Sequence, residues 1–138
     1  MYIDSNIFIF AATDKDKLGQ NCREIIRLIN EQKITCVASF LVIDEVMWIL
    51  KKNIGRDDAI KITKAMLSMP IKWVEVDKSV IVKMIDIFEK TILDPRDAVH
   101  IASMKELGLS LIVSEDADFD KVKGIERVNA SKCIEKNL

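Results

Sequence analysis

The 138-residue sequence predicts an α/β fold with three layers, α/β/α, in which helices cover both faces of a central parallel five-stranded sheet of order 3-2-1-4-5. Short strand-like segments alternate along the chain with segments whose apolar residues recur at helical spacing. Helical connections between successive strands make those strands parallel. The segments that begin at Met1, Ile34 and Leu109 are almost entirely apolar, as central strands are, whereas those at Trp73 and Glu126 contain charge, as edge strands do.

The individual elements follow in chain order. The predicted strands cover residues 1–4, 34–38, 73–76, 109–113 and 126–128. The predicted helices cover residues 5–12, about 18–32, 39–52, about 57–68, 80–92 and 94–107. Ser39 is predicted to cap the third helix. Asp94 followed by Pro95 predicts the start of the sixth helix, and Gly108 predicts its end.

Length and composition fit one globular domain over residues 1–138, with 49% hydrophobic and 31% charged residues and about the last eight residues frayed. No apolar run approaches the roughly 18 residues that span a bilayer and no basic leader is present, so we expect a soluble, cytoplasmic protein without membrane contact. The net charge is −1, which excludes a general positive field that would attract nucleic acid. Cys22, Cys36 and Cys133 show no C-x-x-C spacing and are predicted to be reduced core thiols.

Four acidic residues fall where such a sheet places a ligand site. Ligands of open parallel sheets bind beyond the carboxyl ends of the strands, at the point where the strand order reverses, here between strands 1 and 4. Asp4 ends strand 1, Asp116 follows strand 4, and Asp97 lies in the first turn of the helix before strand 4. Glu45 lies in the helix after strand 2, in a segment so apolar that we expect its carboxylate to be buried with a partner.

These four carboxylates predict a metal site. Converging carboxylates repel one another unless they are protonated or neutralised by a cation. Their oxygen ligands suit Mg²⁺ or Mn²⁺ better than zinc. The chemistry that fits is phosphodiester hydrolysis, in which one or two ions activate water and offset charge on the phosphoryl oxygens without a side-chain nucleophile.

Two of the acids also have a purely structural interpretation. Asp4 and its neighbours Ser5 and Asn6 are all residue types that cap helices. Asp97 stands three residues after Asp94, close to the capping-box position. Taken singly, neither acid separates a cap from a metal ligand.

Neighbouring residues leave further alternatives open. Asp44 offers a second acid on the helix after strand 2. Asp116, Asp118 and Asp120 alternate in a turn, as in a calcium loop, but the glycine and glutamate of an EF-hand frame are missing. His100 is the only histidine and no serine elbow accompanies it, so we interpret it as a packed residue or as one that supports a site ligand.

Four motifs occur in a fixed order along the chain. They are the opening Y-I-D-S-N-I-F, the D-E-V of the third helix, the D-P-R-D-A-V-H-I-A at the start of the sixth helix, and the S-E-D-A-D-F-D after strand 4. Together they span residues 1–120 and resemble the PIN-domain nucleases, and in size the toxin ribonucleases of VapBC-type toxin–antitoxin pairs.

The resemblance implies a specific site. The residues that would be catalytic and hold Mg²⁺ or Mn²⁺ are Asp4, Glu45, Asp97 and Asp116. It favours Glu45 over Asp44 and adds Asp118 as a candidate further acid. Asn6 and Ser114 would support the site, with Ser114 standing where Thr is commoner.

The resemblance also implies RNA as substrate, a homodimer and, for a toxin, an antitoxin protein whose tail occupies the acidic groove. Arg96, Lys51 and Lys121 are candidate RNA contacts, although a charged residue on a helix is more often solvated surface. Trp48 is interpreted as a core residue rather than a platform for base stacking. The expected function is therefore a divalent-metal-dependent endoribonuclease, with the toxin of a toxin–antitoxin pair as its biological role.

Two other functions compete with this one. A PIN-domain RNA-processing nuclease without an antitoxin would carry the same residues. A non-catalytic, Mg²⁺-binding receiver-like module needs an acid beside Asp4, an acceptor Asp ending strand 3 and a lysine after strand 5, and only Asp77 approaches this pattern. A D-x-D phosphatase is disfavoured because Asn6 takes the position of its second acid. No residue selects RNA over DNA.

Overall fold

The computed structural model describes residues 1–136, in which five strands and eight helical segments alternate. The strands are β1 (Tyr2–Ile3), β2 (Val37–Ser39), β3 (Lys72–Val74), β4 (Leu111–Val113) and β5 (Glu126–Val128). The helices are α1 (Ser5–Thr13), α2 (Lys17–Asn30), α3 (Leu41–Ile54), α4 (Arg56–Leu67), α5 (Lys78–Lys90), α6 (Pro95–Glu106), the 3-10 helix η1 (Ala117–Lys121) and α7 (Ala130–Glu135).

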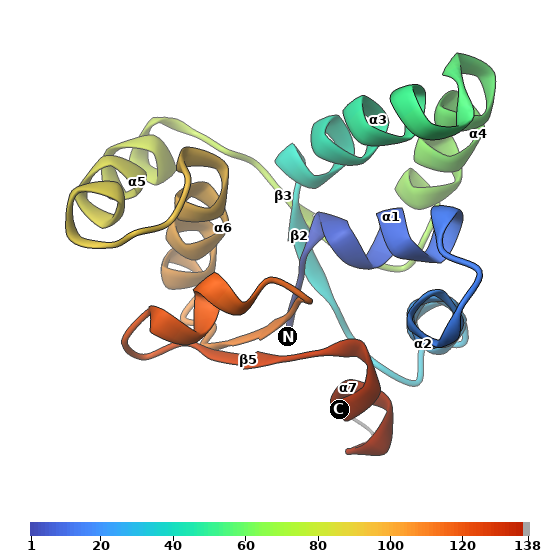
Figure 1. The fold of residues 1–138 in the computed structure, drawn as a ribbon. Helices are drawn as coiled ribbons and strands as arrows, with labels where there is room; N and C mark the ends of the chain where they lie inside the picture. The colour runs from blue at the N-terminus through green and yellow to red at the C-terminus, as the bar shows by residue number, and fades with distance from the viewer. Residues whose placement is uncertain (137–138) are drawn as a thin grey trace.

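All strand pairs are parallel, and the sheet order is β3-β2-β1-β4-β5, as the sequence predicted (Figure 1). Tyr2 pairs with Val37 on one side and with Ile112 on the other, so β1 lies at the centre. The sheet pairing continues past the strand ends, because the Asp4 amide donates to the Val113 carbonyl at 3.1 Å. The order reverses between β1 and β4, which places a crevice beyond their carboxyl ends.

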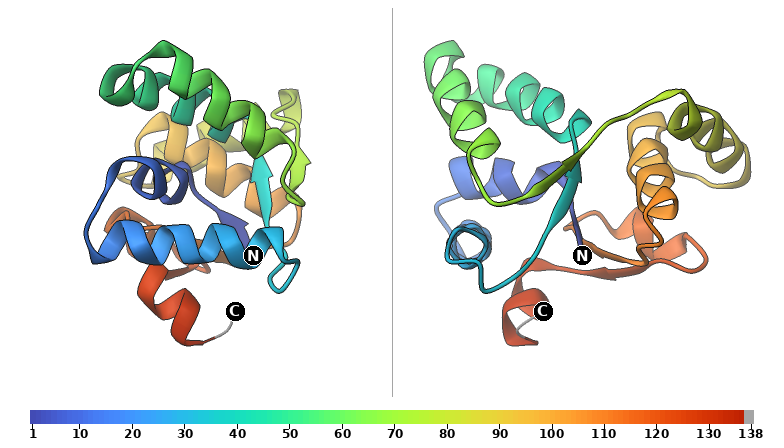
Figure 2. Two further views of the ribbon diagram at one scale, coloured as in Figure 1. Left: turned by 90° about the vertical axis from the view of Figure 1, so that its right-hand side faces the viewer. Right: turned by 180° about the vertical axis from the view of Figure 1, so that it is seen from behind.

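Helices cover both faces of the sheet, which confirms the three-layer α/β/α prediction. α1 and α2 lie on one face, with α3 and α4 packed beyond α1, whereas α5 and α6 cover the other face (Figures 1 and 2). Each face has its own apolar core, and strand alternation divides β1 between them. Ile3 belongs to the core on the α1 and α2 side, and Tyr2 belongs to the core on the α5 and α6 side.

The start and end of α6 follow the predicted signals. Asp94 is the N-cap, Pro95 is the first helical residue, and Gly108 follows the end of the helix with a positive φ of 65°. Proline suits the first helical position because its missing N–H would have no partner there, and glycine adopts a positive φ without a Cβ clash. The segment therefore holds Asp97 in the first turn, at the carboxyl edge of the sheet.

The predicted cap of the third helix is wrong. Ser39 does not cap α3: it ends β2, is fully buried, and its Oγ lies 2.9 Å from the Tyr2 hydroxyl oxygen. Phe40 is the N-cap instead, without a side-chain bond. Most of the tail that the sequence predicts to fray forms α7 (Ala130–Glu135), which packs against α2. Asn129 caps α7 through its Oδ1, which accepts from the Lys132 amide at 2.9 Å. Residues 137–138 of the predicted tail lie outside the described residues.

The cysteine prediction is confirmed, because Cys22, Cys36 and Cys133 are buried and free. Burial raises the thiol pKa of Cys22 and of Cys36 to about 12, so both remain protonated and unreactive at neutral pH. Within residues 1–136, no helix has both the length and the apolarity that a membrane crossing demands.

Candidate active site

Asp4 and Asp116 lie at the ends of neighbouring central strands, as the sheet order requires. Asp4 follows β1 and caps α1, because its Oδ1 accepts from the Ser5 amide at 2.6 Å. Asp116 follows β4 and caps η1 by accepting from the Asp118 amide at 2.9 Å. Asp4 therefore caps α1 and also lies at the crevice, because α1 begins directly beyond the end of β1 and needs its cap at that point.

α3 presents its two adjacent acids to different surroundings. Glu45 lies on the buried face of the helix and is 7% exposed. The Asp44 side chain is 71% exposed, and its carboxylate lies 3.9 Å from the Arg96 guanidinium. Of the two, only Glu45 lies among the buried polar groups behind the crevice.

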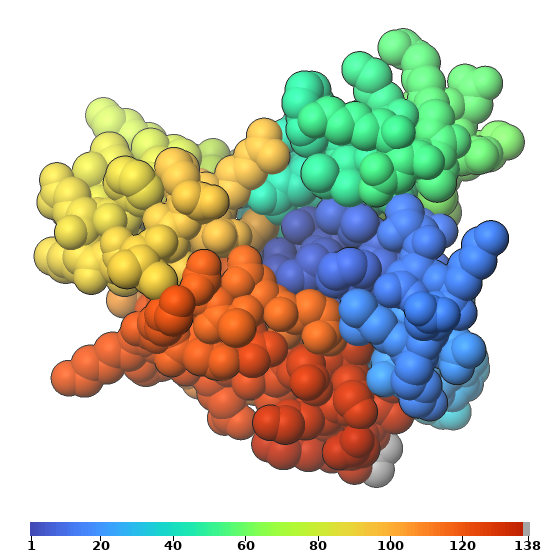
Figure 3. All heavy atoms as spheres, in the orientation of Figure 1, coloured from blue at the N-terminus to red at the C-terminus, as the bar shows by residue number. Residues whose placement is uncertain are grey.

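Asp97 lies at a cleft of about 430 Å³ where these elements meet. In Figure 3 the N-terminal segment (dark blue) lies between α3 (teal), the start of α6 (gold) and the segment after β4 (orange). The lining residues of the cleft are Glu45, Asp94, Pro95, Arg96 and Asp97. Burial raises the pKa of Asp97 to about 7, and the negative charges of Asp4, Asp116 and Glu45 act in the same direction. The charges of Asp4, Glu45 and Asp116 therefore act on Asp97, and within residues 1–136 the ligand atoms of Asp4 and Glu45 cluster with His100 rather than with Asp97 or Asp116.

The Asp4 carboxylate is held by side chains from two separate segments. Asn6 Nδ2 donates to Asp4 Oδ2 at 2.7 Å, and Ser114 Oγ donates to the same oxygen at 2.6 Å. Asn6 also donates to Ser114 Oγ at 2.9 Å, and the Asp116 amide donates to that hydroxyl at 3.0 Å. Burial raises the pKa of Asp4, while Ser114 and His100 oppose this effect. Asn6 and Ser114 thus tie the ends of β1 and β4 to one carboxylate.

His100 is the residue whose place the sequence left undecided. It is fully buried, and its Nε2 lies 2.9 Å from Glu45 Oε2 and 3.8 Å from Asp4 Oδ1. Ligand atoms of these three residues lie within 4.8 Å of one another. Burial favours the neutral ring, but Tyr2, the bond to Glu45 and the charge of Asp4 outweigh it and raise the pKa of His100.

Sequence reasoning missed Tyr2 and Ser39, the polar groups behind His100. Tyr2 Oη lies 2.9 Å from His100 Nδ1 and also accepts from the Ser39 amide at 3.1 Å. Two signals were present in the sequence. Strand alternation turns Tyr2 away from Ile3 and toward α6, and His100 follows Asp97 by one helical turn, on the same side of α6.

Other predicted residues lie at the periphery. The Asp118 carboxylate is paired with Lys121 at 2.7 Å, and both side chains are about half exposed. Lys51 is exposed on α3, with its ammonium 5.9 Å from the Trp48 ring centroid. Trp48 is 49% exposed, so its interpretation as a core residue is wrong. Arg96 differs from these residues because it lines the acidic cleft itself.

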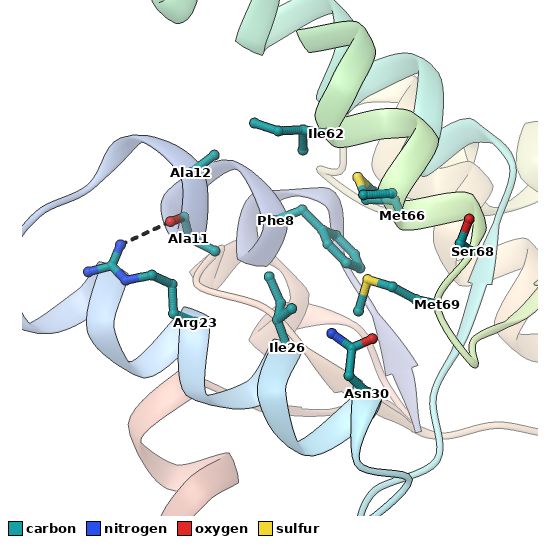
Figure 4. Close-up of a pocket in the computed structure, with 11 residues that line it drawn as sticks. Phe8, Ala11, Ala12, Arg23, Ile26, Asn30, Ile62, Met66, Ser68 and Met69 are labelled. Carbon is teal, nitrogen blue, oxygen red and sulfur yellow. Dashed lines mark hydrogen bonds between the residues drawn. The ribbon is translucent and has the colours of Figure 1, made fainter. Parts of the chain in front are cut away.

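A larger hollow of about 450 Å³ lies away from the acids, between α1, α2 and α4 (Figure 4). Its surface is mainly apolar, with Phe8, Ile26 and Met69 facing the space. Arg23 lies at one side, where its guanidinium donates to the Ala11 carbonyl at 2.9 Å. Among the described residues 1–136, no carboxylate lines this hollow, whose surface offers mainly apolar contact.

Comparison with known proteins places this geometry in a family. No curated protein matches the chain in sequence. Similar solved structures include VapC20 of Mycobacterium tuberculosis, a Sarcin-Ricin loop cleaving toxin, with a TM-score of 0.72, 16% identity and coverage of 87% of this chain and 92% of that chain. DNA-bound VapBC of Salmonella typhimurium has a TM-score of 0.71, 17% identity and coverage of 94% and 96%. PAE2754 of Pyrobaculum aerophilum has a TM-score of 0.71, 15% identity and coverage of 99% and 93%. The family model described as PIN domain matches residues 1–125, and the chain therefore belongs to the PIN domain family.

Proposed function

We propose that the protein is a divalent-metal-dependent endoribonuclease that hydrolyses RNA phosphodiester bonds and acts as the toxin of a toxin–antitoxin pair. The observation that carries this proposal is the gathering of Asp4 and Glu45 beside His100 at the sheet crevice of a PIN domain, with the charges of Asp4, Asp116 and Glu45 raising the pKa of the neighbouring Asp97. Asp4, Glu45, Asp97 and Asp116 come from the β1 end, α3, α6 and the segment after β4. Membership of the PIN family also removes the receiver-like alternative.

The residues at the crevice fit Mg²⁺ or Mn²⁺. Asp4, Glu45, Asp97 and Asp116 would hold one or two ions, since their oxygen ligands suit hard cations. The repulsion that raises the pKa of Asp97 is relieved when a cation binds. When bound, the metal would supply an activated water and offset charge on the phosphoryl oxygens.

The chain's own side chains would orient the reacting groups. Asn6 and Ser114 fix the Asp4 carboxylate through bonds of 2.7 and 2.6 Å. Arg96 lines the cleft beside Asp97 and would contact an RNA phosphate there. Lys51 on α3 and Lys121 at the end of η1 do not line the cleft and would meet flanking phosphates.

The proposed partners are an RNA substrate and an antitoxin protein. Among the structural neighbours, VapC20 is described as a Sarcin-Ricin loop cleaving toxin, and others are described as toxin–antitoxin or VapBC complexes. We place the protein in the cytoplasm, where both partners would be synthesised.

A homodimer is supported by α5. This helix leaves four large apolar side chains 37–53% exposed on the surface of one chain: Ile81, Val82, Ile85 and Phe88. A second copy would remove them from water, and a twofold axis lets the same patch serve both chains. Within residues 1–136 no α5 residue lines the cleft at Asp97, so contact through this patch would leave the cleft lining of each chain uncovered.

The proposal is tested by cleavage of an end-labelled single-stranded RNA with purified protein and Mn²⁺. Wild type and Asp86→Asn, a control at an exposed acid of α5, are expected to cleave, whereas Asp97→Asn and wild type in excess EDTA are not. Cleavage that survives both Asp97→Asn and EDTA would contradict the proposed site. Binding of Mn²⁺ without cleavage of a varied RNA pool would contradict the proposed catalysis.

A further inference from the structure

A line of buried polar groups runs from the sheet to Glu45. Tyr2, Ser39 and His100 are each fully buried, and Glu45 is 7% exposed. The Tyr2 oxygen lies 2.9 Å from Ser39 Oγ and 2.9 Å from His100 Nδ1, and His100 Nε2 lies 2.9 Å from Glu45 Oε2. Burial of polar groups costs free energy unless each finds a partner, and here the four groups satisfy one another.

The bonding pattern sets which way the His100 ring faces. An ionised Glu45 can only accept, so the proton of the Glu45 bond must reside on His100 Nε2. The single hydroxyl proton of Tyr2 goes either to His100 Nδ1 or to Ser39 Oγ. If it goes to Ser39 Oγ, Nδ1 carries its own proton and donates to the Tyr2 oxygen. Both arrangements leave an N–H on Nε2 that is directed at Glu45.

The Tyr2 hydroxyl is not needed for the apolar packing of the ring. A phenylalanine ring at position 2 would keep the apolar contacts of Tyr2 with the α6 layer and the tilted ring contact with His100, whose centroid lies 5.6 Å away. The hydroxyl oxygen is instead anchored at the end of β2, because the Ser39 amide donates to it at 3.1 Å. The sheet thereby fixes the oxygen, and the oxygen fixes the orientation of the imidazole.

The imidazole in turn lies between two acids that repel each other. Its Nε2 is 2.9 Å from Glu45 Oε2 and 3.8 Å from Asp4 Oδ1. Groups that hold metal ligands from behind set the geometry of the site before the ion arrives. A donor in this place would keep Glu45 turned toward Asp4 in the metal-free protein.

We propose that His100, oriented by the Tyr2 hydroxyl and Ser39, is the positioning residue that aims the Glu45 carboxylate at the metal site. This inference rests on the proposed function, in which the acidic cluster binds a divalent ion. It assigns a role to His100, which is not one of the four proposed metal ligands. The Tyr2 oxygen acts through two hydrogen bonds on a carboxylate that it does not touch.

The test compares Tyr2→Phe with Ser103→Ala in a protein free of a histidine tag. Ser103 Oγ is also a buried hydroxyl, but it donates to the Val99 carbonyl within α6 at 2.9 Å, apart from Glu45. Isothermal titration calorimetry with Mn²⁺ is expected to give about a 10-fold weaker affinity for Tyr2→Phe, in line with losses at groups behind metal ligands, and little change for Ser103→Ala. If Tyr2→Phe binds Mn²⁺ as tightly as Ser103→Ala does, the inference is overturned, whereas the proposed metal site of the wild-type protein is not.

A second measurement uses the folded wild-type protein alone. His100 is the only histidine, so its imidazole nitrogens give a single set of ¹⁵N resonances. A protonated Nε2 is expected without metal, with a resonance that moves when Mg²⁺ is added. A ring protonated only on Nδ1 would overturn the inference. Absence of Mn²⁺ binding by wild type would instead overturn the proposed function, and the inference with it.

Discussion

Asp97→Asn is expected to stabilise the metal-free protein while it removes activity. The pKa of Asp97 is raised to about 7 by burial and by the nearby charges of Asp4, Asp116 and Glu45, so its ionised form is unfavourable in the fold. The folded protein therefore holds this proton more tightly than the unfolded chain does. Its contribution to stability is fully present below pH 3.8 and is lost as pH rises to about 7. Asparagine keeps the shape and never acquires the charge.

The expected size follows from the pKa. A rise from 3.8 to about 7, at 1.36 kcal/mol for each pH unit, corresponds to about 4 kcal/mol for a fully buried group. Asp97 is only partly buried, so solvent screening reduces this to about 2 kcal/mol. For a chain of this length, that gain corresponds to a rise in Tm of roughly 6–10 °C at pH 8.

The assay is thermal unfolding in EDTA at several pH values, with Asp86→Asn as the control at an exposed acid. The Tm difference between Asp97→Asn and wild type should be small at pH 4 and should grow up to about pH 7. Asp86→Asn should follow wild type throughout. A variant that is less stable than wild type at pH 8, or a difference that does not depend on pH, would refute the electrostatic reasoning.

Four further predictions concern metal, catalysis and assembly. Mn²⁺ should raise the wild-type Tm more at pH 8 than at pH 5.5, because protons compete for Asp97; equal increments in thermal unfolding would count against binding at this residue. Asp116→Asn should lower kcat/KM for RNA cleavage by more than about 100-fold with an unchanged circular dichroism spectrum, and near-normal cleavage would exclude it as a ligand. Ser114→Ala should lower kcat/KM about 10-fold, because Asp4 Oδ2 loses a donor at 2.6 Å; loss of folding instead would show a purely structural role. Phe88→Glu should turn a dimer into a monomer in sedimentation equilibrium, since it places a charge in the apolar patch of α5, and an unchanged mass would refute that interface.

The sheet was predictable because its strands differ in how much apolar surface they must bury. β1 and β4 lie inside the sheet with helices on both faces, and their residues are apolar without alternation. β3 and β5 lie at the edges and tolerate Lys72 and Glu126. Ser39 was assigned wrongly because local sequence shows a capping residue before a helix but not the Tyr2 oxygen that binds it across the sheet. Tertiary contact outweighed local propensity there.

The site was predictable as far as the strand ends determine it. Asp4 and Asp116 are placed by β1 and β4, and the crevice rule brings them together without further knowledge. Glu45 required the additional argument that a carboxylate in an apolar helix needs a partner, and the sequence did not identify that partner as His100. A lone histidine on a helix faces either core or crevice according to the helix rotation, which local sequence does not determine.

The four acids differ in how well the protein compensates their charge, and this difference indicates where a cation contributes most. Asp4 accepts from Ser5, Asn6 and Ser114, and Glu45 accepts from His100. Within residues 1–136, Asp97 accepts no hydrogen bond from a side chain and lies at the open cleft, and its pKa rises to about 7. The carboxylates of Asp4 and Glu45 are therefore fixed by the fold, whereas under the proposed function a bound metal would neutralise the charge of Asp97. Removing the charge of Asp97 should therefore raise the stability of the metal-free protein and lower its metal affinity. Removing a hydrogen-bond donor to Asp4, such as the Ser114 hydroxyl, should lower both.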